Sequence, residues 1–179
     1  LETEPELEFS SMHRMCDNLR EKENSELIER WISGETGFPF MDACMKYLKE
    51  RGWINFRMRA MIMSFASYNL WQPWQVTSPL LAELFVDYEP GIHIPQVQMQ
   101  SGVTGINLPR IYSVTKQSRD QDPEAIWMKK VLPLLNDFDI EDIHNANLNE
   151  KYIIPIVDLK ESSKHARDKI WGARKGSEF

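Results

Sequence analysis

The chain has 179 residues and a formal net charge of −6, and 42% of its residues are hydrophobic. This length supports one domain with a hydrophobic core, and the composition is that of an ordinary globular protein. The negative charge argues against binding of nucleic acid over the whole surface, although it leaves room for a local basic patch. No apolar run reaches the about 18 residues that a transmembrane helix needs, so no membrane partner is expected.

The two ends of the sequence carry separate expectations. The chain starts with LETEPELEFSS rather than Met and has no signal peptide, so we expect a piece of a longer cytoplasmic protein. Residues 1–23 show no clear period and are predicted to form an arm that packs against something else. Residues 176–179, GSEF, are read as native sequence or a cloning remnant and carry no weight in the fold. Cys16 and Cys44 cannot form a metal site by themselves and read as free thiols of a reducing cytosol.

Three helices are predicted in the first half of the chain. Asn24 or Ser25 caps the first, which ends at Gly34. The second opens at Pro39, where no backbone N–H is needed, and stops at Gly52. The third runs over about residues 54–70, and apolar side chains almost encircle it, so we expect a central, buried helix.

The stretch after the third helix is predicted to contain little regular structure. Ser78 and Pro79 cap a short helix, LLAELFVD, which leads into an acidic stretch. Residues 87–122 are punctuated by Pro and Gly and read as a long loop. Loops of that length inside a compact domain are usually functional.

The last third of the chain returns to helical patterns. Asp122 and Pro123 begin a helix that closes at Pro133. A polar loop follows as far as Tyr152, and an amphipathic helix with a basic outer face covers about residues 161–174. The prediction is an all-α protein with one domain.

Two arginines of the predicted central helix stand out. Arg57 and Arg59 are two residues apart, which places them about 200° apart around the helix axis. A buried guanidinium without a partner is costly, so each arginine is expected to serve a partner of its own. From the pattern alone, these partners are carboxylates in structural ion pairs or a bound ligand.

Two segments resemble signatures of the photolyase/cryptochrome superfamily. WISGETGFPFMDACMKYLKERGWINFRMR at 31–59 is similar to the family pattern W-x-x-G-x-T-G-[YF]-P with a later G-W-x-x-N-R-x-R. RIYSVTKQSRDQDPEAIWMKKVLPLL at 110–135 resembles a second family pattern. The resemblance implies the C-terminal portion of a helical FAD-binding domain of photolyase/cryptochrome type, from a bacterial photolyase-related branch. It also implies an upstream half of the same protein as a partner.

The resemblance implies a set of cofactor-binding residues: Trp53, Phe56, Arg59, Asp87, Glu89 and His93. Arg59 and Asp87 match an arginine–aspartate pair beside the flavin, and Glu89 matches the next acidic position. His93 occupies the position of an asparagine that faces flavin N5. A structural ion pair without a ligand, and a hydrogen-bonded surface histidine, are the alternatives for these positions.

The family's electron-transfer chain of tryptophans is only partly present. Trp74 matches its middle member and is the tentative catalytic residue, with core packing as the alternative. Val97 stands where the tryptophan nearest the flavin is expected, and Met99 stands at another tryptophan position. Trp71 or Tyr68 would have to supply another route for the electron.

A further group of residues matches family positions that face DNA phosphates: Arg57, Arg110 and Lys116. Phosphate contacts of this kind give an affinity that falls with salt. The alternative is a set of solvated or ion-paired surface cations on an acidic chain. Phe56 and Ala60 replace an asparagine and a methionine of repair enzymes, which makes the cavity more apolar and weakens the case for repair of cyclobutane dimers.

Three functions follow as hypotheses. The first is a photolyase-like flavoprotein, a lyase, in which light-excited FAD passes an electron to damaged DNA. The second is a cryptochrome-type blue-light photoreceptor that signals to a protein partner through its flavin redox state. In the third, this chain alone no longer binds FAD, is inactive and self-associates through an apolar face that the upstream half would cover. No metal site is expected.

Overall fold

The computed structural model describes residues 3–20, 22–106 and 110–175. For residues 174 and 175 it describes only the backbone. The predicted all-α class is confirmed, since the described ranges form helices and turns and contain no strand. Residues 176–179 lie outside the described residues. None of the described helices is long and apolar enough to cross a membrane.

The first half of the chain folds close to its prediction. Helix α1 spans Ser25–Ile32, and α2 spans Pro39–Arg51 and ends at Gly52, whose φ of 73° suits a residue without a side chain. Helix α3 spans Phe56–Ser64 and continues as a π-helical turn, Phe65–Asn69. The expected central burial holds for positions 60–70, whereas the first turn of α3 faces solvent.

The predicted loop over 87–122 is wrong. It contains helix α5 (Pro90–Ser101) and helix α6 (Val114–Gln121). Pro90 stands at the first helical position, where proline is tolerated, and Gly102 closes the helix with a φ of 72°. Proline and glycine therefore mark the two ends of α5.

The start of the short helix before this region was also wrongly predicted. Helix α4 spans Trp74–Ala82, so Ser78 and Pro79 lie inside it and do not cap it. Pro73 precedes the helix in an extended conformation with a ψ of 132° and takes the cap position.

The remaining elements are three helices: α7 (Ile126–Val131), α8 (Ile140–Asn145) and α9 (Leu159–Lys175). The polar loop expected before Tyr152 is therefore interrupted by α8. Short 3-10 turns complete the described structure: Pro5–Glu8, Arg14–Cys16, Pro133–Asp137 and Asn149–Lys151.

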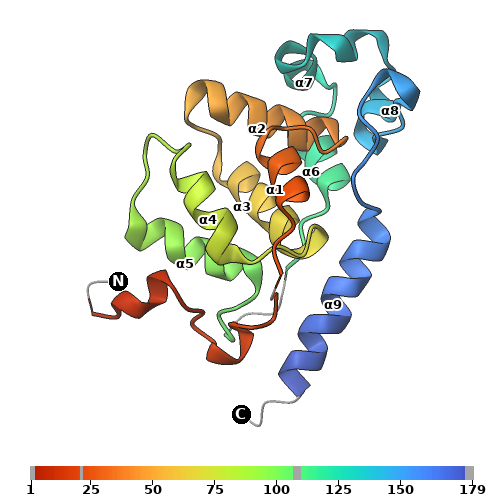
Figure 1. Cartoon of the computed structure of the whole chain (residues 1–179). Helices are drawn as coiled ribbons and strands as arrows, with labels where there is room; N and C mark the ends of the chain where they lie inside the picture. The colour runs from red at the N-terminus through yellow and green to blue at the C-terminus, as the bar shows by residue number, and fades with distance from the viewer. Residues whose placement is uncertain (1–2, 21, 107–109, 176–179) are drawn as a thin grey trace.

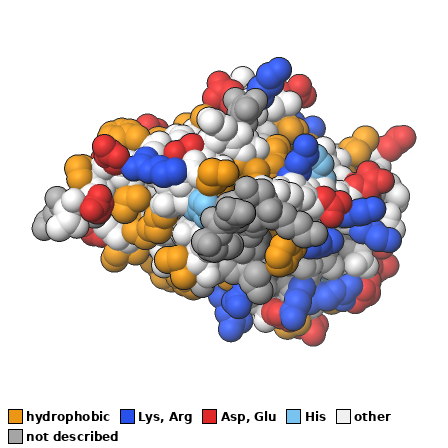
Figure 2. Space-filling view, turned by 90° about the horizontal axis from the view of Figure 1, so that it is seen from below, with side chains coloured by type: hydrophobic (Ala, Val, Ile, Leu, Met, Phe, Trp, Pro, Cys, Tyr) orange, Lys and Arg blue, Asp and Glu red, His pale blue; other side chains and the backbone are white. Residues whose placement is uncertain are grey.

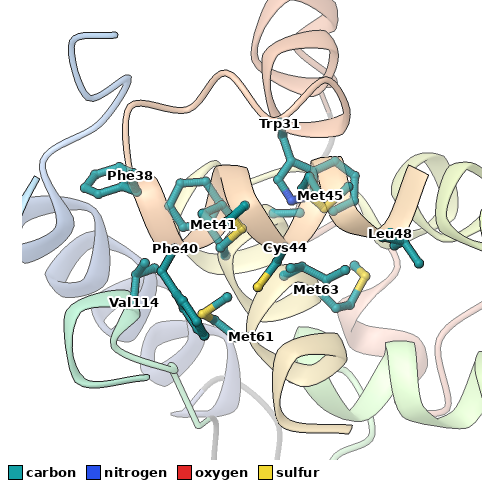
Figure 3. Close-up of a cluster of buried hydrophobic side chains, with 14 of the residues drawn as sticks. Trp31, Phe38, Phe40, Met41, Cys44, Met45, Leu48, Met61, Met63 and Val114 are labelled. Carbon is teal, nitrogen blue, oxygen red and sulfur yellow. The ribbon is translucent and has the colours of Figure 1, made fainter. Parts of the chain in front are cut away.

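Helix α2 lies at the centre of the fold, with α1, α3, α6, α7 and α8 packed around it (Figure 1). Figure 3 shows its apolar side chains meeting those of α3 and α1. The labelled members of this core include Trp31, Phe40, Met41, Cys44, Met45, Met61 and Met63. Both cysteines are buried, and they form no disulfide.

Helix α9 extends along one side of the molecule (Figure 1). Its exposed side chains include four basic ones: Lys160, Lys164, Arg167 and Lys169. In Figure 2, Lys and Arg side chains gather on the right, which is the side of α9. The predicted amphipathic character of this helix is confirmed, because Ala166 and Ile170 on its inner face are buried.

The N-terminal arm packs against helices of the same chain. Arg20 is 5% exposed and donates from Nε to the Ser67 carbonyl at 2.7 Å and from Nη2 to the Ser101 carbonyl at 2.9 Å. Burial lowers the pKa of Arg20 to about 10, so the guanidinium stays charged at neutral pH. The side chain of Gln98 on α5 accepts from the Met12 N–H at 2.7 Å. These bonds fix the described part of the arm to α5 and to the turn after α3.

The turn before α2 is held by a buried carboxylate. Asp42 Oδ1 accepts from the Thr36 N–H at 2.7 Å and the Thr36 hydroxyl at 2.6 Å. Oδ2 accepts from the Gly37 N–H at 3.0 Å and from the Tyr152 hydroxyl at 2.8 Å. One side chain therefore ties the turn and α2 to the segment before α9.

Candidate functional site

A cavity of about 360 Å³ opens between α3, α5 and the loop that joins α4 to α5. All six residues implied as cofactor-binding line it: Trp53, Phe56, Arg59, Asp87, Glu89 and His93. The other walls are mostly apolar: Ile54, Ala60, Met63, Leu81, Phe85, Tyr88, Ile92 and Val97. Residues more than thirty positions apart in the sequence thus meet at one site.

An ion pair stands at this cavity. Arg59 Nη2 donates to Asp87 Oδ2 at 2.9 Å, and Arg59 Nε donates to the Ile54 carbonyl at 2.8 Å. The guanidinium carbon also lies 4.3 Å from the centre of the Phe85 ring. The hydrogen bond from Arg59 lowers the pKa of Asp87. The pair is partly open to solvent, with side-chain exposures of 27% for Arg59 and 48% for Asp87.

His93 reaches the cavity from α5 and is held on one side by α4. Its Nε2 lies 3.1 Å from both the carbonyl oxygen and the hydroxyl oxygen of Ser78. Its ring packs edge-on against Tyr88 at 5.3 Å and Phe85 at 6.0 Å. Since a carbonyl only accepts, the neutral ring carries its proton on Nε2 and leaves Nδ1 as an acceptor.

Burial, aided by the nearby Arg59 charge, lowers the pKa of His93 below its usual range. Between the lowered value and the ordinary value of about 6.5, the unfolded chain binds more protons than the folded chain. The free energy of unfolding is therefore expected to rise with pH through this window. The contribution of His93 to stability is complete above the ordinary pKa and is lost as the pH falls through the folded pKa. Urea unfolding at a series of pH values from 4 to 8 measures this rise in the free energy of unfolding. The His93→Gln variant should lack the rise. An unchanged rise in that variant would assign it to another group.

Two glutamines of α5 also line the cavity, and the sequence reasoning missed both. Gln96 Oε1 is buried and has no hydrogen-bond partner among the described residues. Gln100 is 7% exposed. Positions 93, 96, 97 and 100 follow helical spacing, and this signal was obscured when the segment was read as a loop.

Trp74 lies outside this cavity. It is 2% exposed, begins α4, and donates from Nε1 to the Ser11 hydroxyl at 3.1 Å. These contacts are those of a core residue that anchors the arm. Val97 lines the cavity, whereas Met99 does not. An electron-transfer role for Trp74 stays a prediction.

The three predicted DNA-contacting cations are exposed: Arg57, Arg110 and Lys116. Helices α3 and α6 run antiparallel, because Asn55 bonds to Gln121 at 3.1 Å while the Tyr112 N–H bonds to the Ser64 hydroxyl at 3.1 Å. Arg57 and Arg110 therefore stand at opposite ends of this helix pair. Over the described ranges, none of the three forms a salt bridge, and no group of three or more potential metal ligands occurs.

Known proteins are similar to this chain in sequence and in fold. The family described as the FAD binding domain of DNA photolyase matches residues 1–172. The deoxyribodipyrimidine photo-lyase of Alkalihalophilus pseudofirmus is 29% identical over an alignment of 154 residues that covers 78% of this chain and 32% of that protein. Cryptochrome DASH of Gloeobacter violaceus is 29% identical over an alignment of 166 residues that covers 85% of this chain and 33% of that protein. The chain thus spans about a third of the length of these relatives.

Solved structures agree with the sequence relatives. An archaeal photolyase from Sulfolobus tokodaii, solved with two FAD molecules, is 27% identical and superposes with a TM-score of 0.87 over 98% of this chain and 40% of its own. A bacterial class III photolyase from Agrobacterium tumefaciens has the same fold, with a TM-score of 0.85 at 23% identity over 96% of this chain and 39% of its own. The chain therefore belongs to the family of FAD-binding domains of DNA photolyases.

Proposed function

We propose that the cavity between α3 and α5 holds the isoalloxazine ring of FAD in a photolyase-like flavoprotein that acts on damaged DNA. The observation that carries the proposal is the meeting of all six implied cofactor residues on one cavity with apolar walls and a fixed guanidinium. When bound, FAD would supply the light-driven electron transfer, and the protein would position and tune it.

The residues present fit a flavin ring. The volume of about 360 Å³ lies within the about 300–1,000 Å³ typical of small-molecule sites. Gln96 Oε1 is a buried acceptor that a ring N–H would satisfy. The Arg59 guanidinium, held by Asp87 and the Ile54 carbonyl, offers a fixed positive charge to an electron-rich ring.

Damaged DNA is the proposed partner at the mouth of the cavity. Trp53 and Phe56, 51% and 60% exposed, give that mouth an aromatic rim on which a base would stack. The exposed cations Arg57, Arg110 and Lys116 would contact phosphates. Both cysteines are buried and form no disulfide, which suits a reducing compartment, so a cytoplasmic location is part of the proposal.

A photoreceptor of cryptochrome type is the second candidate, and Phe56 favours it. Its exposed ring lies at the mouth, at the position where the family resemblance leads one to expect the asparagine of repair enzymes. An apolar side chain removes a polar contact to a lesion while leaving the flavin side of the cavity intact. In this candidate the output is a conformational signal to a protein partner.

The test is a titration of the purified chain with FAD and with lumiflavin, which consists of the ring alone. We expect quenched flavin fluorescence and a structured absorption band for both, with weak affinity because the chain carries only part of the contacts of its relatives. No binding of either at millimolar concentration would overturn the proposal. In a protein that has the full length of these relatives and contains this chain, blue-light repair of a UV-irradiated oligonucleotide supports the photolyase, and flavin photoreduction without repair supports the photoreceptor.

A further inference from the structure

We propose that Gln96 and Gln100 form a hydrogen-bonding face on α5 that recognises the imide edge of a planar heterocycle. An imide edge consists of a ring N–H with a ring carbonyl on each side of it. The inference rests on the proposed function, because it concerns the same cavity and names the chemical group of the ligand that the cavity binds.

The two amides belong to one stripe of α5. Positions 93, 96, 97 and 100 are spaced by three or four residues, so their side chains lie on the same side of the helix. All four of these residues line the cavity. Gln96 and Gln100 are one turn apart, with about 5–6 Å between Cβ atoms at this spacing. The cavity therefore has one wall with two amides in a row.

Gln98, two residues away on the same helix, shows what a structural glutamine does here. Its Oε1 accepts from the Met12 N–H at 2.7 Å, and its Nε2 donates to the Leu7 carbonyl at 2.7 Å. By contrast, no hydrogen bond of the Gln96 or Gln100 side chain occurs in the described part of the chain, and Gln96 Oε1 is buried. Native proteins rarely leave such an atom without a partner, so a ligand is the natural partner for this one.

Small side chains give the ring edge access to these amides. Val97 lies between the two glutamines on α5, at a position where the family resemblance leads one to expect a tryptophan. On the α3 side the wall contains Ala60, where the resemblance leads one to expect a methionine. The cavity can therefore admit a flat ring with its edge toward α5.

The chemistry of a carboxamide selects the ligand. Its oxygen accepts one hydrogen bond and its NH₂ group donates, so it pairs with a ring N–H and the adjacent ring carbonyl at once. An imide offers a second carbonyl on the other side of the N–H, which suits the second glutamine. Two sources carry this edge: the pyrimidine end of the isoalloxazine ring, and a thymine or uracil base.

Methylation of the imide nitrogen tests the proposal. Lumiflavin, N3-methyl-lumiflavin, thymidine and 3-methylthymidine are each titrated into the wild-type chain, Gln96→Leu and Gln75→Leu. Gln75 lies on α4 outside this cavity and is the matched control. We expect N3-methylation to weaken lumiflavin binding to the wild type about tenfold, and Gln96→Leu to weaken unmethylated lumiflavin by a similar factor. Gln96→Leu should no longer distinguish the two flavins, and Gln75→Leu should behave as wild type.

Each outcome has a separate meaning. Equal binding of lumiflavin and its N3-methyl form to the wild type overturns the imide face and leaves the flavin proposal standing. Absence of lumiflavin binding overturns the flavin proposal. Thymidine binding that is lost on N3-methylation and in Gln96→Leu supports the imide face with a nucleobase as its source. A lower Tm of unliganded Gln96→Leu would assign Gln96 a structural role and overturn the proposal, since we expect an equal or higher Tm.

Discussion

Asp42→Ala is expected to lower the free energy of unfolding by about 3–5 kcal/mol. The change leaves the Thr36 N–H, the Gly37 N–H and the Tyr152 hydroxyl without their acceptor, and each buried donor left unpaired costs about 1–3 kcal/mol. The turn has little room to rearrange after this change, because Gly37 packs closely against Pro155. Gly37 has a φ of 84°, and a Cβ at this position would lie 2.5 Å from the Pro155 nitrogen. Urea unfolding followed by circular dichroism measures the loss.

Two further variants serve as comparisons for Asp42→Ala. Tyr152→Phe removes only one of the four hydrogen bonds to Asp42 and should cost about 1 kcal/mol. Asp120→Ala removes an exposed carboxylate and should change the free energy of unfolding little. A loss below about 1 kcal/mol for Asp42→Ala would contradict the prediction. It would mean that water or a rearranged turn replaces the carboxylate.

The helices with local start and stop signals were predictable from the sequence. Helix α2 begins at Pro39 and ends before Gly52, as expected, because both positions act through backbone geometry alone. The same logic failed for α5, since the proline at its start and the glycine at its end were read as loop residues. A proline at the first helical position loses no hydrogen bond, so its presence does not distinguish the start of a helix from a turn.

The site was predictable only in part. Family resemblance pointed to Arg59, Asp87 and His93, and the structure gathers them at one cavity. The role of Gln96 needed the helical register of α5, which the local reading missed. The anchoring of the arm had no sequence signal either, because Arg20 bonds to backbone carbonyls of residues 67 and 101, which any residue type supplies. Long-range contacts of this kind follow from the tertiary fold.

Asp87→Ala is expected to weaken flavin binding about tenfold or more, or to shift the redox potential of the bound flavin, while it barely changes the stability of the unliganded chain. The ion pair with Arg59 is partly solvated, with exposures of 27% and 48%, and such pairs contribute at most about 1 kcal/mol to stability. We propose that the ion pair instead serves ligand binding, because it holds the Arg59 guanidinium in place for a ligand that excludes water from the site. Flavin titration and urea unfolding of the same variant separate the two effects.

Glu141→Ala is the matched control, because Glu141 forms an exposed two-point ion pair with Arg119 at 2.7 Å, outside the cavity. That variant should retain wild-type flavin affinity. Asp87→Asn keeps an oxygen acceptor for Arg59 but removes the charge, so it should fall between wild type and Asp87→Ala. Unchanged flavin affinity and absorption spectrum in Asp87→Ala would refute the role of the pair in binding. In that case the Ile54 carbonyl and the Phe85 ring would be sufficient to position Arg59.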